Sequence, residues 1–138
     1  MLRLAAILSI LAGPVVATGI EVEVAGEGAN GTVTIDLLED VAPLHAERIA
    51  QLAAEGAYDG VVFHRVIDGF MAQTGDVQFG KAGGNIAMAG GGGSALPDLP
   101  AEFSDVPYDR GIVGMARSQN PNSANSQFFI MFAEGYFL

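Results

Sequence analysis

Short apolar runs separated by turn residues constrain the fold of this chain more than any other feature of its sequence. The runs are rich in Val, Ile and Phe, and Gly, Pro and Asn stand between them. The three-to-four residue spacing of an amphipathic helix is scarce. With 138 residues, the chain is long enough for one domain. The pattern therefore predicts a single, mainly β domain with about one or two helices.

The first residues differ in kind from the rest of the chain. A short positive segment, Met1–Arg3, precedes an almost continuously apolar stretch, Leu4–Val16, and Val15–Ala17 supplies short side chains at a cleavage point. This arrangement is typical of a cleavable secretory signal peptide, and the stretch is too short and too interrupted for a spanning helix. An uncleaved hydrophobic anchor is the alternative. We expect residues 1–17 to be a signal peptide and residues 18–138 to be an exported domain, periplasmic or secreted, with no membrane attachment after cleavage.

Composition argues against several classes of function. The chain has no cysteine, so an exported form would be held together by packing without disulfides. It has 6 Lys or Arg against 16 Asp or Glu, a formal net charge of −10. Nucleic-acid binding is not expected, because phosphate contacts need a basic surface. No group of residues has the spacing of metal ligands or of a nucleophile motif. We therefore expect no metal, no cofactor and no conventional hydrolytic chemistry.

Two alternating segments at the start of the domain predict a β-hairpin. Ile20–Val24 and Thr32–Leu37 alternate apolar and polar residues, as half-exposed strands do. The dipeptide Asn30-Gly31 between them suits a tight hairpin turn. The Asn-Gly-Thr pattern at this point also matches a glycan acceptor, but the turn explains it with less assumption.

The segment Pro43–Glu55 is the one convincing helix. Pro43 suits the first helical position, and long or apolar side chains recur at three-to-four spacing. Gly56 stands where a left-handed cap would end the helix. His45 has no polar constellation nearby in sequence, and we expect it on the surface.

The segment Phe63–Asp76 predicts a second hairpin that carries an unusual polar pair. Arg65 and Gln73 stand among apolar residues, although an arginine is almost never buried without a partner or a task. The register of the hairpin decides whether the two side chains share a face, and the function of that face has to explain why they are polar.

The length of the turn decides this register. A two-residue loop would place Arg65 opposite Ala72. A three-residue loop, Asp68–Phe70, would place Arg65 opposite Gln73. Only the second register puts Met71 on the same face as Arg65 and Gln73, and it is the one we expect.

The second half of the chain predicts long loops and two further strands. The segment Gly75–Ala82 nearly matches a phosphate-binding loop, but its last position lacks the Ser or Thr hydroxyl that magnesium needs, so we reject that function. A glycine-rich region follows to Pro100. Gly111–Arg117 predicts a strand, Ser118–Ser126 a polar loop, and Gln127–Phe132 a strand buried on both faces.

An apolar surface that carries one arginine and one glutamine would suit a proline within a peptide. Phe70, Met71 and Phe129 supply the apolar part, and Arg65 and Gln73 are set into it. The Xaa-Pro bond isomerises slowly because rotation breaks amide resonance. A donor aimed at the prolyl nitrogen favours the twisted state, in which this nitrogen has regained its lone pair. The alternative is structural: Arg65 would bridge loops by donating to carbonyl groups. Residue types alone do not separate the two.

Two motifs in the right order resemble the signature of cyclophilin-type peptidyl-prolyl isomerases. The first is Phe63–Asp76, and the second joins Gly111–Arg117 to Pro121–Ile130. The similarity runs from about Gly31 to the last residue and is closest to compact exported bacterial members. It implies a cyclophilin-like antiparallel β-barrel with one helix present. The family's closing strands and second helix are missing, so we expect a domain truncated at its C-terminus.

The resemblance also implies a role for each residue of the site. Arg65 is the implied catalytic guanidinium, Gln73 orients it and the substrate, and His64 lies beside them as support rather than as a proton carrier. The residues implied to bind substrate are Phe70, Met71, Ala116, Arg117, Gln127, Phe129, Phe137 and Leu138. Thr74 stands where the family often has glycine, a departure that we expect to be tolerated.

The implied activity is peptidyl-prolyl cis-trans isomerisation of accessible Xaa-Pro bonds, without a cofactor. The implied partners are proline-containing polypeptides, in particular other exported proteins whose folding would be assisted. The alternative is a proline-peptide binding module or holdase without turnover, because the barrel would be incomplete.

Overall fold

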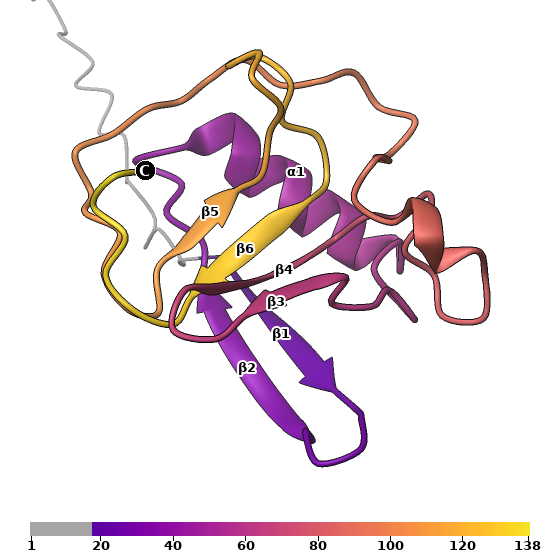
Figure 1. Cartoon of the computed structure of the whole chain (residues 1–138). Coiled ribbons are helices and arrows are strands. Elements are labelled where there is room, and N and C mark those ends of the chain that lie inside the picture. The colour runs from indigo at the N-terminus through magenta and orange to yellow at the C-terminus, as the bar shows by residue number, and fades with distance from the viewer. Residues whose placement is uncertain (1–17) are drawn as a thin grey trace, which may run out of the picture.

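The structure is a computed structural model that describes residues 18–138, so the predicted signal peptide, residues 1–17, lies outside the described part. The elements in chain order are β1 (Gly19–Val24), β2 (Gly31–Asp36), α1 (Pro43–Ala54), β3 (Arg65–Ile67), β4 (Met71–Thr74), the short 3₁₀ helix η1 (Ile86–Met88), β5 (Val113–Met115) and β6 (Phe128–Met131). They form a two-stranded antiparallel sheet, β1-β2, and a four-stranded antiparallel sheet in the order β3-β4-β6-β5 (Figure 1). The mainly β class with a helix is therefore confirmed, and within the described residues the sheets do not close into a barrel.

The first hairpin forms as predicted, but its tight turn does not. Val24 pairs with Gly31, so the connection is the longer loop 25–30, and Gly31 already belongs to β2. The side chain of Asn30 accepts a hydrogen bond from the backbone N–H of Gly26 at 3.1 Å and holds this loop together. The prediction of a two-residue turn at Asn30-Gly31 is wrong because the asparagine closes a longer loop through its side chain.

Helix α1 begins at Pro43 as predicted and ends one residue before the predicted end. The N–H groups of Gly56 and Ala57 donate to the carbonyls of Ala53 and Leu52, which is the hydrogen-bond pattern of a Schellman cap. At the other end, the carboxylate of Glu102 accepts from the first N–H groups of the helix, those of Leu44 and His45. A distant loop therefore caps the helix, because Ala42 at the N-cap position has no side chain that can do so.

The expectation of a surface position for His45 is wrong. Its ring is half-buried, with Nε2 at 2.7 Å from the carbonyl oxygen of Pro100 and at 3.8 Å from the Glu102 carboxylate. Both partners lie more than 50 residues further along the chain, so no local pattern could reveal them.

The register of the second hairpin is confirmed. Arg65 pairs with Gln73 and Ile67 pairs with Met71, across the three-residue loop. The predicted strand Val61–Ile67 is shortened to its last three residues, because Val62 donates to the carbonyl of Gly80 instead of continuing the ladder with β4.

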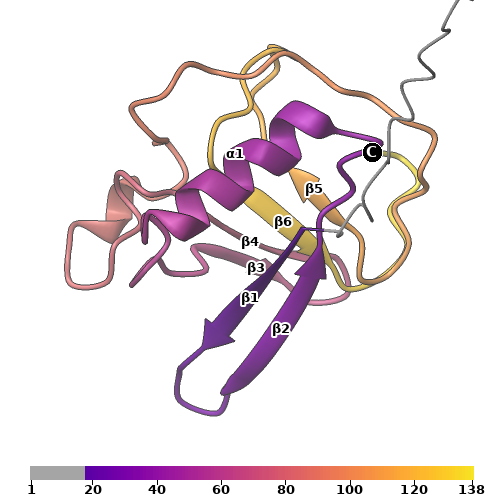
Figure 2. The same cartoon turned by 180° about the vertical axis from the view of Figure 1, so that it is seen from behind.

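The hydrophobic core lies between α1, the β1-β2 hairpin and one face of the four-stranded sheet. Ile35 from β2, Ile49 from α1 and Phe128 from β6 form its centre. Figure 2 shows α1 lying across this face of the sheet. Side chains of a strand alternate between its two faces, so the neighbours of the core residues point to the other side. That other face carries the candidate site. No helix in the described part is long and apolar enough to cross a membrane.

Candidate active site

One row across the four-stranded sheet brings the predicted site residues together. Arg65 on β3 pairs with Gln73 on β4, Gln73 with Phe129 on β6, and Phe129 with Gly114 on β5. Directly paired residues of antiparallel strands share a face. Adjacent strands lie about 4.8 Å apart, which puts the backbones of Arg65 and Phe129 about 10 Å from each other. A guanidinium, an amide and an aromatic ring are thus lined up on the face opposite the core.

Arg65 is exposed, not buried as its apolar neighbours in sequence suggested. No residue within 18–138 accepts a hydrogen bond from its guanidinium. Arg65 forms no ion pair in that region either, since the ion pair found there joins His45 to Glu102. The structural role considered for Arg65 belongs instead to Arg48. That side chain is 7% exposed and donates to the carbonyls of Pro97 and Asn125. The guanidinium of Arg65 is therefore exposed and makes no hydrogen bond to another residue of 18–138.

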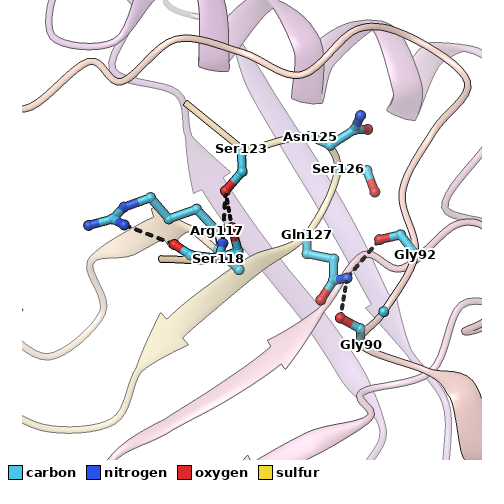
Figure 3. A pocket seen from close by; sticks show the side chains of 10 residues that line it. Gly90, Gly92, Arg117, Ser118, Ser123, Asn125, Ser126 and Gln127 are labelled. Atoms are coloured by element: carbon cyan, nitrogen blue, oxygen red, sulfur yellow. Dashed lines mark hydrogen bonds between the residues drawn. The ribbon is translucent and has the colours of Figure 1, made fainter. Parts of the chain in front are cut away.

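Gln73 is held by a second glutamine. Its Nε2 donates to Oε1 of Gln127 at 2.9 Å. Nε2 of Gln127 in turn donates to the carbonyls of Gly90 and Gly92 at 3.1 and 2.8 Å (Figure 3). Gln127 is only 8% exposed, and both ends of its amide are used. This leaves the carbonyl oxygen of Gln73 as the remaining acceptor beside Arg65.

Phe129 lies over β5 because residue 114 is glycine. A Cβ atom at Gly114 would come within 2.5 Å of Cζ of Phe129 and 2.6 Å of the Tyr108 hydroxyl oxygen. The rings of Phe129 and Tyr108 stack with centroids 5.6 Å apart. Tyr108 and Gly114 thus seat the aromatic wall of the site. Sequence reasoning missed Tyr108, which stands in an acidic stretch with no local signal.

The other predicted apolar residues are divided between the interior and the surface. Met71 is 2% exposed, although the register places it on the same face of the sheet as Arg65 and Gln73. The ring of Phe70 is half-buried and packs on that of Phe137, with centroids 5.7 Å apart. Phe137 is 78% exposed and Leu138 is 53% exposed. Phe70 and Phe137 therefore form an aromatic pair at the β3-β4 turn.

Ala116, Arg117 and Gln127 line a pocket of about 230 Å³ beside the row. The other walls are the backbone of Gly90–Gly92 and the polar residues Ser118, Ser123, Asn125 and Ser126 (Figure 3). The N–H of Ala116 already donates to the carbonyl of Gln127 at 2.9 Å, so it is not free for a peptide. The Arg117 guanidinium donates to the carbonyl of Ser118 and lies over the ring of Phe103.

The ring of His64 lies outside the row. Both of its nitrogen atoms are buried and have no hydrogen-bond partner among the residues that the structure describes, and a Cβ atom at Gly90 would lie 3.3 Å from the ring. Burial lowers the pKa of His64, the negative charge of Asp76 opposes this, and the positive charge of Arg65 adds to it. His64 is therefore held neutral as a packing residue.

Two buried polar residues lie beside the site, Thr74 at the end of β4 and Asp76 shortly after it. Thr74 is 5% exposed, and its hydroxyl donates to the carbonyl of Val62 at 2.9 Å, so a side chain in place of glycine is accommodated. Asp76 is 0% exposed, and its carboxylate accepts from four backbone N–H groups. Burial alone would raise the pKa of Asp76, but these four hydrogen bonds bring it below its usual value. No group of three or more His, Asp or Glu side chains within residues 18–138 could hold a metal ion.

Comparison with known proteins agrees with this fold. Residues 20–138 match the family model described as cyclophilin type peptidyl-prolyl cis-trans isomerase/CLD. A probable peptidyl-prolyl cis-trans isomerase of Brucella suis is 64% identical over 111 residues, which are 79% of this chain and 57% of that protein.

Two solved structures are similar as well. A cyclophilin-type peptidyl-prolyl cis-trans isomerase of Cryptosporidium parvum, solved in the presence of the dipeptide Ala-Pro, is 31% identical with a TM-score of 0.67, over 78% of this chain and 66% of that one. The cyclophilin AquaCyp293 of Hirschia baltica is 28% identical with a TM-score of 0.64, over 78% of this chain and 56% of that one.

The chain belongs to the cyclophilin-type peptidyl-prolyl cis-trans isomerase family. It spans little more than half the length of the Brucella relatives that it matches.

Proposed function

We propose that this chain is a peptidyl-prolyl cis-trans isomerase in which Arg65 donates a hydrogen bond to the prolyl nitrogen. The observation that carries this proposal is the row of Arg65, Gln73 and Phe129 on one face of the sheet. The row offers an aromatic wall for the proline ring and a charged donor within two strand spacings of it. The family and its named relatives support the same activity.

The catalytic effect required of this geometry is modest. Bringing a rate of about 0.01 per second to about 100 per second requires roughly 5.5 kcal/mol. A hydrogen bond from a charged donor contributes about 1.5–3 kcal/mol. In the planar ground state the prolyl nitrogen accepts poorly, so this hydrogen bond strengthens only as the bond twists. Holding the ring against Phe129 and removing water from it would supply the remainder.

The pocket beside the row would receive a second part of the peptide. Gln127 belongs both to the pocket and to the hydrogen bonds that hold Gln73. An extended peptide with its proline on Phe129 would therefore pass Gln127, and a neighbouring side chain would enter the pocket. The presence of Ala-Pro in the Cryptosporidium structure supports a proline-containing ligand.

The substrates we propose are exported polypeptides whose folding is limited by Xaa-Pro bonds. The support for export is the apolar pattern of residues 1–17 alone. One observation favours the alternative, a proline-peptide binding module without turnover. The Arg65 side chain is held by no described partner, so it must be ordered in each binding event, at a cost of about 1.5–2 kcal/mol.

Exchange NMR on a short Xaa-Pro peptide tests this proposal. The chain should accelerate isomerisation, and Arg65→Ala should abolish most of the acceleration. Arg110→Ala is the matched control, because Arg110 is also an exposed arginine and lies outside the row. Full acceleration by Arg65→Ala would contradict the assigned role. Peptide binding without any acceleration by the unaltered chain would favour the binding module.

A further inference from the structure

The buried carboxylate of Asp76 joins two segments that are distant in sequence. Its Oδ1 accepts from the N–H groups of Gln78 and Phe79 at 3.0 and 2.9 Å, in its own turn. Its Oδ2 accepts from the N–H groups of Gly90 and Gly92 at 2.8 and 2.9 Å. The side chain is 0% exposed, and it forms no ion pair within residues 18–138. Its charge is therefore compensated by backbone N–H groups alone, which ties the glycine loop to the end of β4.

The glycine loop approaches Asp76 too closely for any side chain at position 92. A Cβ atom at Gly92 would lie 2.5 Å from Oδ1 of Asp76 and 2.8 Å from Cβ of Gln78. Real Cβ atoms essentially never come this close to another atom. This contact explains the glycine at position 92 of the Gly90–Gly93 run.

Gly90 and Gly92 bind Asp76 through their N–H groups and the site residue Gln127 through their carbonyl groups. The carbonyls of Gly90 and Gly92 accept the two hydrogen bonds from Nε2 of Gln127 (Figure 3). Oε1 of Gln127 then accepts from Nε2 of Gln73, which is paired with Arg65. Hydrogen bonds on the two sides of the Gly90–Gly92 backbone therefore connect the buried carboxylate of Asp76 to Gln127 and then to Gln73, opposite Arg65.

We propose that Asp76 is a positioning residue, which fixes the amide of Gln127 through the Gly90–Gly92 loop and thereby the amide of Gln73 opposite Arg65. This inference rests on the proposed isomerase function. Loss of the carboxylate displaces the two carbonyls that hold Gln127, and the amide of Gln73 then loses its partner. Asp76 contacts no substrate in this scheme, and its effect on the reaction passes entirely through Gln127.

The test combines activity with a measurement that does not depend on activity. The variants are Asp76→Asn, Gln127→Ala and the double variant, with Asp40→Asn as a control for the loss of an exposed carboxylate. Asp76→Asn keeps the size of the side chain but replaces one acceptor oxygen by a donor. We expect kcat/KM of Asp76→Asn to fall about tenfold. The double variant should match Gln127→Ala within about twofold, because both changes act through one amide. The side-chain NH₂ resonances of Gln73 and Gln127 should shift in Asp76→Asn and stay in place in Asp40→Asn.

Several results would overturn the positioning role. They are unchanged NH₂ resonances in folded Asp76→Asn, unchanged kcat/KM in that variant, or losses that multiply in the double variant. Should Asp76→Asn fail to fold, Gly92→Ala takes its place, since its Cβ displaces the loop while the carboxylate stays. Gly92→Ala must then shift the same NH₂ resonances and lower kcat/KM, and unchanged values refute the proposal. An unaltered chain without isomerase activity would refute the proposed function, while the NH₂ resonances would still decide whether Asp76 positions Gln127.

Discussion

Arg48 and Arg65 should give opposite phenotypes when each is replaced by methionine. Methionine keeps most of the apolar stem and removes the guanidinium. Arg48 is 7% exposed, and its guanidinium donates to the carbonyls of Pro97 at 2.7 Å and Asn125 at 3.3 Å. Arg65 is exposed and donates to no residue within 18–138. We therefore expect Arg48→Met to lower stability with isomerase activity retained in the folded fraction, and Arg65→Met to lower isomerase activity with stability retained.

The magnitudes follow from these contacts. A hydrogen bond from a charged donor contributes about 1.5–3 kcal/mol, and the 3.3 Å bond of Arg48 is the weaker of its two. Arg48→Met should lower the free energy of unfolding by about 3 kcal/mol. Arg65→Met should change it by less than about 0.5 kcal/mol, as surface substitutions usually do. Loss of the hydrogen bond to the prolyl nitrogen should lower kcat/KM about 10- to 100-fold.

Urea unfolding followed by far-UV circular dichroism measures the first effect, and exchange NMR of an Xaa-Pro peptide measures the second. With a urea slope of about 1–3 kcal/mol per M, the midpoint of Arg48→Met should fall by about 1–3 M. If Arg65→Met destabilises the fold as much as Arg48→Met, Arg65 is a structural arginine, and if it keeps full isomerase activity, Arg65 is not the catalytic donor. The assignment of roles would then be wrong.

Three further substitutions test the support of the site. His64→Phe should leave stability and activity nearly unchanged, because burial disfavours a charge on the ring and neither ring nitrogen has a hydrogen-bond partner among residues 18–138. A loss of activity above about tenfold would restore a chemical role for His64. The pKa of Asp76 is lower in the folded state than in the unfolded state, so its carboxylate stabilises the fold above the unfolded pKa of about 4, and this stabilisation is lost as pH falls through the folded pKa. In urea titrations, the unaltered chain and Asp76→Asn should therefore differ in unfolding free energy at neutral pH and converge as the solution becomes acidic. A difference that does not change with pH would contradict this. Tyr58→Phe should lower the unfolding free energy by about 1–2 kcal/mol, since the hydroxyl donates to the carbonyl of Ser126 at 2.8 Å, and an unchanged urea midpoint would contradict this.

Local patterns sufficed where a feature depends on neighbours along the chain. The three-residue loop fixed the pairing of Arg65 with Gln73, because a hairpin's register follows from its turn length. Pro43 marked the start of α1, which is also a local feature, because the fixed φ of proline suits the first turn of a helix. The row across β3, β4 and β6 then needed one further fact, the pairing of β6 with β4, which no periodicity contains.

Features that depend on distant loops could not be predicted. The carboxylate of Asp76 meets Gly90 across 14 residues, and Arg48 meets Asn125 across 77. An arginine in an amphipathic helix and a single aspartate after a strand look like ordinary surface residues in the sequence. Their burial becomes favourable only because loops supply carbonyl or N–H partners. The glycine run was visible, but its reason, the close approach to Asp76, is a property of the folded chain.

The two ends of the site row are not held equally firmly. Phe129 lies on β6, between β4 and β5, and its ring is fixed between Gly114 and Tyr108. Arg65 lies on β3, a strand of three residues that pairs only with β4 among the described elements. Short edge elements open locally at a lower free-energy cost than the centre of a sheet. Binding of a proline ring to Phe129 survives such an opening, whereas placement of the guanidinium does not. If Arg65 acts as proposed, changes that loosen β3 should therefore lower kcat more than they raise KM.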